Sequence, residues 1–292
     1  MAGDSHPRTG FFRDKIIIFR LPDSASPDIG AHMTSLTFSA APEALLWPDN
    51  AHNIGVKTET SSLFFPYYFS AMLATNATET SACFRLRHQV YCEELGFEAL
   101  KPDNLETDAF DTRAMHACIQ HNHKQQLVGT VRVITSCNNT ELLPLEQHFA
   151  GLITEHSLAP QRFARQHICE ISRLAVPAEV RRQHHRGNAC STTEQQCYRQ
   201  VAVALYLIAT QLCLQTNRYH SFVMIEPALA RILRRIGIQF VQIGEAINYN
   251  GLRAPYYLDM RTTSVTLATE YQQLRARLAQ QLNATPELQF IA

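Results

Sequence analysis

Charged residues in apolar surroundings place the strongest constraint on how this chain can fold. The segment LETDAFD, residues 105–111, carries three carboxylates within six residues. Three arginines far from it in sequence stand inside apolar runs: Arg87 in FRLRHQVY, Arg132 in LVGTVRVIT and Arg173 in ICEISRLAV. Because an unpaired buried charge is costly, we expect the fold to bring these distant segments together in one paired cluster.

Bulk composition narrows the class of protein. A chain of 292 residues with 46% hydrophobic residues can bury a sizeable core as one large or two small domains. Its 26 basic and 26 acidic residues cancel, so nucleic acid is not an expected partner. The eight cysteines form no CxxC pair and several stand in apolar runs, which indicates reduced thiols in a cytoplasmic protein. The longest apolar run, 201–214, is shorter than the roughly 20 residues of a membrane span, so we expect no transmembrane segment.

Hydrophobic periodicity predicts alternating strands and helices from residue 67 onward. Strands are expected at 67–74, 114–120, 127–135, 167–176, 220–225, 239–244 and 255–260. Helices are expected at 81–95, 198–216, 227–236 and 263–282, with a short helix inside 136–165. The helix at 198–216 is apolar on nearly every side and should be buried. Residues 1–65 show no sustained period and are predicted to be a partly disordered extension, which leaves 66–285 as the folded domain.

Several charged residues also have a plainer interpretation. Arg87 could lay its aliphatic stem along the edge of the core with its head in water, and LETDAFD could be a solvated acidic loop. A loop as long as 97–112 is nevertheless more often functional than idle. The histidines at 116, 121 and 123 could bind a metal ion, but two of them stand in or beside a predicted turn. We therefore favour exposed histidines there and predict no metal site.

Five motifs, in order along the chain, carry a family resemblance. They are FRLRHQVYCEELGFE at 84–98, E-x-D-x-F-D at 106–111, LVGTVRV at 127–133, E-x-S-R at 170–173 and MIEPALARILRRIG at 224–237. This pattern resembles the acyl-homoserine-lactone synthases and, more closely, the acyltransferases found beside exosortase/PEP-CTERM sorting systems, which include N-acyl amino acid synthases. The resemblance covers about 84–260 and implies the α/β fold of the GNAT superfamily of N-acyltransferases, with a central mixed, twisted sheet flanked by helices.

The resemblance also implies roles for individual residues. It assigns the acceptor side of the site to six charged residues: Arg87, Glu106, Asp108, Asp111, Arg132 and Arg173. Tyr91 and Phe97 match its aromatic substrate-binding positions, although the homoserine-lactone synthases usually have tryptophan where Phe97 stands. Glu170 is the candidate general base, and Ser172, on the same predicted strand, is the second candidate catalytic residue.

The chemistry can be argued from the residues themselves. Three carboxylates and three guanidiniums form a neutral set that tolerates partial burial if every member is paired. An amino-acid acceptor brings an ammonium that an acid can hold and a carboxylate that an arginine can hold. Attack on a thioester requires the ammonium to lose a proton, for which Glu170 is a reasonable base. Backbone N–H groups from a distorted strand around 169–174 would bind the oxyanion; in a regular strand Arg173 would point away from Glu170 and Ser172.

We therefore expect an N-acyltransferase that moves a fatty acyl chain from a phosphopantetheine thioester to a small amino acid. The donor is acyl carrier protein or, less favoured, acyl-coenzyme A, and no tightly bound cofactor is expected. Cys169 is predicted to be a core residue, because a thioester needs no acyl-enzyme. The basic segment RRQHHRGN at 181–188, ahead of a helix N-terminus near Thr193, could collect the donor's phosphates or be a solvated face.

Three alternatives remain open from the sequence. The first is synthesis of an acyl-homoserine lactone from S-adenosylmethionine. The second is an ordinary acetyl-coenzyme A enzyme. Such an enzyme would have a pyrophosphate-binding loop with several glycines, but the basic segment contains one, Gly187, which disfavours this alternative. The third is a ligand-binding module that kept the fold without catalysis.

Overall fold

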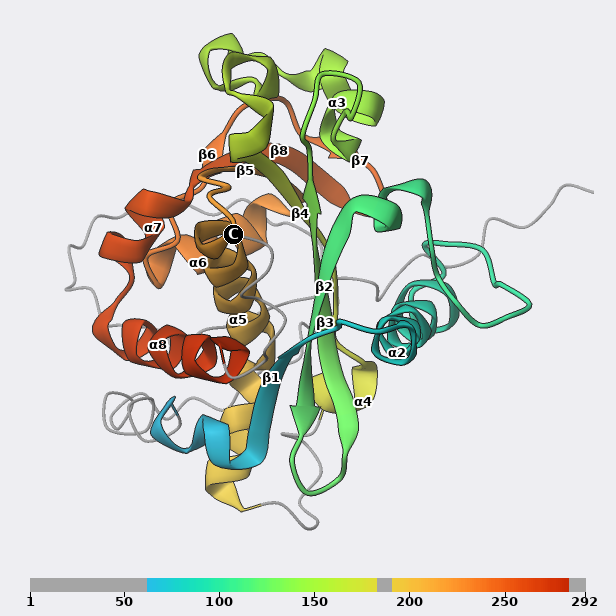
Figure 1. Cartoon of the computed structure of the whole chain (residues 1–292), viewed down its shortest axis with the longest axis vertical. Helices are drawn as coiled ribbons and strands as arrows, with labels where there is room; N and C mark the ends of the chain where they lie inside the picture. Colours follow the sequence, from blue (N-terminus) through green and yellow to red (C-terminus); the bar gives the residue numbers. More distant parts are fainter. Residues whose placement is uncertain (1–61, 183–190, 284–292) are drawn as a thin grey trace, which may run out of the picture.

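The chain folds around one mixed sheet. The computed structural model describes residues 62–182 and 191–283, so most of the predicted extension and residues 183–188 of the basic segment lie outside the described residues. The twisted sheet has helices on both faces (Figure 1), which is the predicted α/β fold.

Eight strands make up the sheet. Their bounds are β1 Phe69–Leu73, β2 Ala114–His121, β3 Gln126–Thr135, β4 Ile168–Ala175, β5 His220–Ile225, β6 Val241–Gln242, β7 Ile247–Asn248 and β8 Leu252–Asp259. Seven follow the order β1-β2-β3-β4-β5-β8-β6, and β7 pairs with β8. The pairs β1–β2, β2–β3, β3–β4 and β5–β8 are antiparallel, whereas β4 and β5 are parallel.

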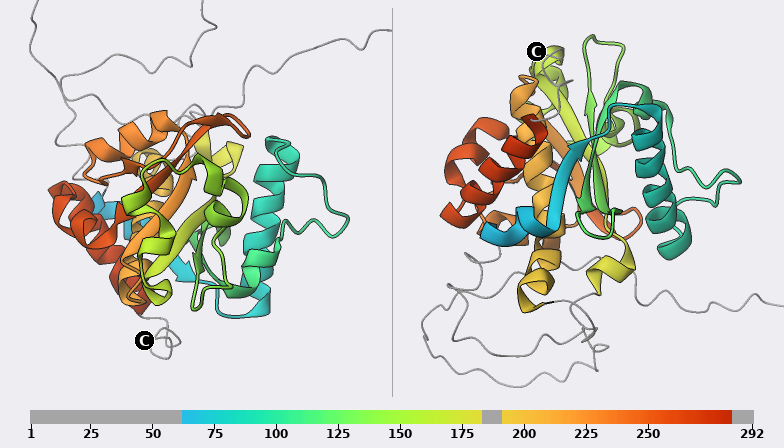
Figure 2. Two further views of the ribbon diagram at one scale, coloured as in Figure 1. Left: turned by 90° about the horizontal axis from the view of Figure 1, so that it is seen from above. Right: turned by 60° about the horizontal axis from the view of Figure 1, so that its bottom comes forward.

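The helices form a layer on each face of the sheet. They are α2 Ala77–His88, α3 Pro144–Phe149, α4 Ala178–Arg181, α5 Thr192–Gln215, α6 Pro227–Arg235, α7 Met260–Thr266 and α8 Thr269–Asn283. Helix α2 continues into a π-helix, η1 Gln89–Glu94, and lies on the face opposite α5 and α8 (Figures 1 and 2). A 3-10 helix, η2 Ala109–Arg113, follows the long loop after η1.

Helix α5 is the centre of the main hydrophobic core. It begins at Thr192, close to the predicted helix N-terminus, and is buried along most of its length, as predicted. By length and composition it is the one helix among the described residues that could cross a membrane, but 83% of its apolar window is buried inside the protein. Gly129 on β3 permits its close approach, because a Cβ there would lie 2.7 Å from Leu205 Cδ1.

Several predicted boundaries were wrong for local reasons. Residues 62–68 are helical, so β1 begins later than the predicted 67. Helix α2 starts four residues before the predicted 81, because the side chain of Asn76 accepts a hydrogen bond from Glu79 N and caps the helix there. The predicted strand 239–244 shrinks to the two residues of β6.

The predicted helix 263–282 is divided into α7 and α8 by a contact that is distant in sequence. Ala268 N donates to Ile236 O, and Thr266 Oγ1 donates to Gly237 O. A Cβ on Gly237 would lie 2.1 Å from Thr266 O, so the two backbones pack directly against each other. The hydrogen-bonding groups that a continuous helix would use are thereby committed to the end of α6.

Two irregularities of β4 shape the site. Arg132 pairs with Ser172 and Thr130 with Ala175, so three steps along β4 oppose two along β3 and Arg173 stands in a β-bulge. Its φ of 49° is in the left-handed region, which is uncommon for a residue other than glycine. In addition, β4 pairs with β5 only over Ile168–Glu170. Beyond Glu170, the edge of β4 that faces β5 has no strand beside it in the described part of the chain.

Candidate active site

Arg87 is the buried centre of the charged cluster. Its side chain is fully buried. Its Nε donates to Glu106 Oε2 at 2.6 Å, and its Nη1 and Nη2 donate to the two carboxylate oxygens of Asp111 at 2.7 and 3.1 Å. The interpretation of Arg87 as a solvated arginine at the core edge is therefore wrong, because all three of these nitrogens are bound to carboxylates.

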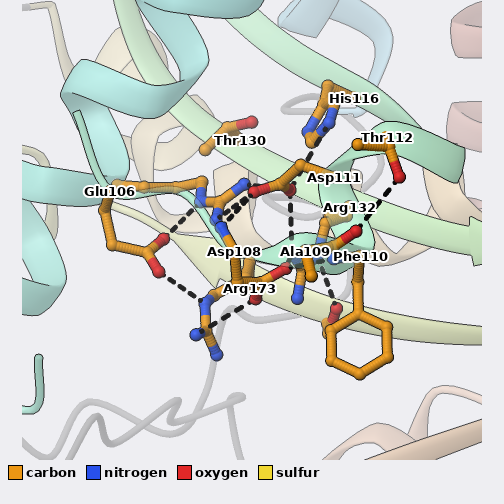
Figure 3. Close-up of polar contacts among 12 residues, drawn as sticks. Glu106, Asp108, Ala109, Phe110, Asp111, Thr112, His116, Thr130, Arg132 and Arg173 are labelled. Atoms are coloured by element: carbon orange, nitrogen blue, oxygen red, sulfur yellow. Dashed lines mark hydrogen bonds and ion pairs between the residues drawn. The ribbon is translucent and has the colours of Figure 1, made fainter. Parts of the chain in front are cut away.

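Arg132 joins the same carboxylates from β3. Its Nη1 donates to Asp108 Oδ1 and to Asp111 Oδ1, both at 2.7 Å (Figure 3). Its Nε donates to Ser172 Oγ at 3.0 Å. Because the Ser172 oxygen accepts this bond, its own hydroxyl hydrogen is left to donate elsewhere.

Arg173 reaches the cluster only because of the β-bulge. Its Nε donates to Glu106 Oε1 at 3.2 Å, and its Nη2 lies 3.1 Å from Glu98 Oε1 and 3.5 Å from Asp108 Oδ2. A regular strand would have pointed this side chain to the opposite face. The bulge therefore unites all six predicted charged residues, which with Glu98 we call the acid–arginine wall.

The acidic segment also organises its own backbone. The side chain of Asp108 accepts from Phe110 N at 2.9 Å, and Asp111 Oδ2 accepts from Asp108 N at 2.8 Å, a capping box at the start of η2. Burial opposes the ionisation of Asp111, but hydrogen bonds from Arg87 and the nearby guanidinium charges hold its pKa well below the usual range. The carboxylate of Asp111, which its acidic neighbours would repel, is thus held ionised by arginines.

Most of the wall is unavailable to a ligand. The side chains of Arg87, Glu106, Asp111 and Arg132 are each at most 7% exposed. The side chains of Asp108, Arg173 and Glu98 are 26%, 23% and 33% exposed. A substrate can therefore touch only these last three. Sequence reasoning missed Glu98, although it is the final residue of the first motif.

Glu170 lies on the same face of β4 as Ser172. The register pairs Glu170 with Ile134 and Ser172 with Arg132. Glu170 is 3% exposed, and the one hydrogen bond to its carboxylate within the described chain comes from Leu145 N, at 2.8 Å. Burial raises its pKa to about 7, against the opposing effects of the Leu145 N–H and nearby arginines. A carboxylate with this pKa can accept a proton at neutral pH.

Tyr91 and Phe97 lie beside the bulge. The wider turn of the π-helix η1 carries Tyr91, whose hydroxyl donates to Leu174 O at 2.8 Å. Arg173 stacks over the Tyr91 ring at 5.5 Å, and Arg253 of β8 lies over the Phe97 ring at 5.9 Å. The prediction of one regular helix over 81–95 missed η1, a kind of distortion that often occurs at functional sites. It also missed Arg253, which stands outside every motif.

The histidines at 116 and 121 lie in different surroundings. His116 lies 3.6 Å from Asp111 Oδ1, and burial lowers its pKa to about 4, so it is neutral. His121 was expected to be exposed but is buried, because its Nε2 contacts Glu194 Oε1 at 2.9 Å in the first turn of α5. Among residues 62–182 and 191–283, no three His, Cys, Asp or Glu side chains are grouped so that they could hold a metal ion.

Two further predicted residues lie away from the chemistry. Cys169 is buried on the α5 face of β4, with its Sγ 3.4 Å from Cys213 Sγ, so it is the predicted core residue. Arg181, the first residue of the basic segment, donates from Nη2 to Glu94 Oε2 at 2.7 Å. Its charge is therefore already paired with a carboxylate.

Comparisons with known proteins place a known domain on part of this chain. Residues 86–187 match the acetyltransferase (GNAT) domain family. No curated protein sequence matches the chain significantly. Among solved structures, BjaI, a CoA-dependent acyl-homoserine lactone synthase solved with MTA, shares 18% identity, with 76% of this chain and 91% of that chain covered and a TM-score of 0.51.

Two other structures show similar figures. MesI, also a CoA-dependent acyl-homoserine lactone synthase, shares 18% identity over 71% of this chain and 94% of that one, with a TM-score of 0.50. FeeM, an N-acyl amino acid synthase, shares 18% identity over 70% and 97%, with a TM-score of 0.48. The likeness to BjaI and MesI establishes the fold. The acetyltransferase (GNAT) domain over residues 86–187 supports an acyltransferase activity.

Proposed function

We propose that this acyltransferase moves a fatty acyl chain from a phosphopantetheine thioester to the amine of an amino acid. The observation that carries the proposal is the position of Glu170. A buried carboxylate whose pKa is about 7 lies on β4 beside the acid–arginine wall, at the point where β4 separates from β5. The proposed general base, the charged wall proposed to bind the amino acid and the free edge of β4 thus lie next to one another.

The exposed members of the wall suit an amino acid. Asp108 and Glu98 can hold an ammonium group, and Arg173 can hold a carboxylate. Asp108 and Arg173 are fixed by bonds to the buried Arg132 and Glu106, and Glu98 is held by Arg173, so little conformational entropy is lost when a substrate binds. The wall therefore positions the acceptor without taking part in bond making.

Glu170 then acts as the general base. It takes a proton from the acceptor ammonium through a water molecule, because its own side chain is buried. The amine lone pair attacks the thioester carbonyl carbon, and the carbonyl oxygen becomes an oxyanion. The C–S bond then breaks to release the thiolate, which takes the remaining extra proton of the nitrogen and leaves as the thiol, while the oxyanion returns to a carbonyl. The hydroxyl of Ser172 and backbone N–H groups of the bulge are the donors proposed for the oxyanion. A thiolate is a good leaving group, so no acyl-enzyme is needed.

The acyl donor carries its thioester at the end of an extended arm that contains amide groups. Beyond Glu170, the backbone groups on the free edge of β4 require partners, and the amides of a phosphopantetheine arm can supply them. Acyl carrier protein and coenzyme A share this arm, and we favour the carrier protein. The seven cysteines of the described chain are free thiols, which supports a cytoplasmic location for the reaction.

The first test is chemical identification of the product. Lipid extracts of a host that expresses the chain should contain a new N-acyl amino acid detectable by mass spectrometry. The purified protein should form it from an acyl-carrier or acyl-coenzyme A donor. Glu170→Gln should lower the rate of transfer at least about 100-fold, whereas Glu179→Gln, at an exposed position on α4, should leave it unchanged. If neither the host nor the purified protein forms such a lipid, the proposal is wrong.

One observation favours a second candidate, synthesis of an acyl-homoserine lactone from S-adenosylmethionine. The wall contains four carboxylates and three guanidiniums, so it carries excess negative charge. Two of the carboxylates, Glu98 and Asp108, are partly exposed and lie against Arg173, which stacks over the ring of Tyr91. Carboxylates and aromatic faces both attract a sulfonium cation. Release of methylthioadenosine during turnover would distinguish this reaction from amino-acid acylation.

A further inference from the structure

A buried ion pair that the proposed mechanism does not use lies next to Glu170. Glu146 of α3 accepts from Arg165 Nη1 and Nη2 at 2.7 and 2.8 Å, and the two side chains are 1% and 9% exposed. Both residues belong to the segment 136–165, which carries none of the five family motifs. The negative charge of Glu146 reaches Glu170, because it contributes to the raised pKa of that carboxyl group.

Hydrogen bonds connect the ion pair to Glu170 through α3. This helix has only six residues, too few to be stable alone, so contacts outside it must hold it in place. Glu146 Oε2 accepts from Leu143 N at 2.8 Å, which fixes the residue just before the helix. Leu145 N, in the first turn, has no acceptor within the helix and donates to Glu170 Oε2 at 2.8 Å. The glutamate that binds Arg165 therefore also sets the direction of the Leu145 N–H.

Arg165 is itself anchored to the loop before α3. Its Nε donates to Ser136 Oγ at 2.8 Å, and its Nη2 donates to Glu141 O at 2.6 Å as well as to Glu146. Ser136 Oγ donates in turn to Glu141 O at 2.8 Å. All three nitrogens of the guanidinium are thus bonded inside the protein, so Arg165 holds its partners in place.

The charges around Glu170 make the balance of this ion pair important. Three guanidiniums on neighbouring elements face it: Arg132 of β3, Arg173 of β4 and Arg113 of η2. Glu146 faces it from α3 with the opposite sign, and Arg165 offsets that charge. Removing Glu146 would leave an extra positive charge that favours ionised Glu170, whereas removing Arg165 would leave an unpaired negative charge that opposes it.

We propose that Glu146 and Arg165 are positioning residues for Glu170, whose ion pair holds the Leu145 N–H against the carboxylate that accepts the proton. Both side chains are buried and bonded within the protein, so they act through the Leu145 N–H and through their charges. The inference rests on the proposed function and deepens it, since it identifies what orients the general base. The plainer alternative is that the ion pair only stabilises the loop 136–143.

The pH dependence of acyl transfer by the full-length protein separates the two roles. The kcat/KM for an acyl-carrier or acyl-coenzyme A donor is measured from about pH 5 to about pH 9, with an equimolar mixture of the common amino acids as acceptor. Glu146→Gln should lower the apparent pKa by about one unit, and Arg165→Gln should raise it by about one unit. In both variants the plateau of kcat/KM should fall about tenfold, because the Leu145 N–H is no longer held on a charged group. A purely structural ion pair would give the two variants the same profile.

Controls separate charge from general damage. Arg165→Lys keeps the positive charge and should return the apparent pKa to that of the wild type, with part of the rate. Glu194→Gln removes the carboxylate that contacts the buried His121 on the α5 face, and it should leave the profile unchanged. Shifts of the same sign in Glu146→Gln and Arg165→Gln, or no shift in either, would overturn the proposal. If Arg165→Gln does not fold, an unchanged profile of Glu146→Gln would overturn it alone.

Glu170 can also be titrated without turnover. Its carboxyl signal in protein labelled with carbon-13 at the glutamate carboxyls is the one missing from the NMR spectrum of Glu170→Gln. Opposite shifts of this titration in the two variants, together with no acyl transfer from any thioester, would refute the proposed function but keep the positioning role. Acyl transfer without opposite shifts would refute the positioning role alone.

Discussion

Replacing Glu170 with glutamine should make the protein less active and more stable. The buried carboxylate has a pKa of about 7, against a usual value of 4.5. Because the pKa is raised in the folded state, Glu170 favours folding in its protonated form, and this contribution is lost as the pH rises from 4.5 through 7. Glutamine cannot ionise, and its side-chain oxygen can still accept the Leu145 N–H.

The magnitude follows from the two pKa values. They differ by about 2.5, and each pKa unit corresponds to 1.36 kcal/mol. Ionised Glu170 therefore lowers the free energy of unfolding by about 3 kcal/mol at pH 8.5, where the carboxylate is ionised in both the folded and the unfolded state. At pH 5 the same linkage lowers the free energy of unfolding by about 1 kcal/mol. The stability advantage of Glu170→Gln over the wild type should therefore grow by about 2 kcal/mol between these pH values.

Urea unfolding followed by circular dichroism at pH 5, 7 and 8.5 measures this trend. A matched control is Glu146→Gln, since Glu146 is also a buried glutamate but binds Arg165 through both oxygens, at 2.7 and 2.8 Å. That change should lower the free energy of unfolding by about 3–5 kcal/mol, because it breaks a buried ion pair. If Glu170→Gln gives no stability advantage that increases with pH, burial does not raise the pKa of Glu170 and our argument for the general base fails.

Activity should follow the same ionisation. The wild-type kcat/KM should rise with pH through an apparent pKa near 7, and Glu170→Gln should lower it at least about 100-fold, the lower end of the range for general bases. A wild-type profile that is flat between pH 6 and 8 would show that another group accepts the proton.

Three further substitutions test the wall, the core and the bulge. Asp111→Asn should cost about 3–5 kcal/mol in urea unfolding at pH 7, because two buried arginines lose their shared partner; since the pKa of Asp111 is lowered in the folded state, the difference should shrink as the pH falls below about 4. Gly129→Ala should cost about 1–3 kcal/mol, because its Cβ would lie 2.7 Å from Leu205 Cδ1; an unchanged urea midpoint would mean that Leu205 moves aside freely. Tyr91→Phe removes the bond to Leu174 O and should cost about 1 kcal/mol of stability while lowering kcat/KM; unchanged kinetics would separate Tyr91 from the site.

The elements of the fold could be predicted where their pattern is local. The buried character of α5 and the β2–β3 hairpin follow from hydrophobic period, which each segment carries by itself. The break between α7 and α8 could not be predicted in this way. It depends on a backbone contact with Gly237, about thirty residues earlier, that no local pattern records.

The membership of the wall could be predicted better than its geometry. Arginines in apolar runs and a crowded acidic segment must find one another, so their association follows from the cost of burying unpaired charge. Which members stay accessible does not follow. Glu98 and Asp108 are exposed enough to meet a substrate, whereas Glu106 is sealed between two arginines.

The amino-acid sequence by itself determined which residues carry the charge, which helix is buried and that the polar segments must converge. Only the tertiary structure decided how they converge. The bulge turns Arg173 to the face of Glu170, the separation of β4 from β5 frees a strand edge, and Arg253 comes to lie over Phe97. Each depends on strand register and on contacts between distant segments, whereas the periodicity of one segment reports only on that segment's own buried face.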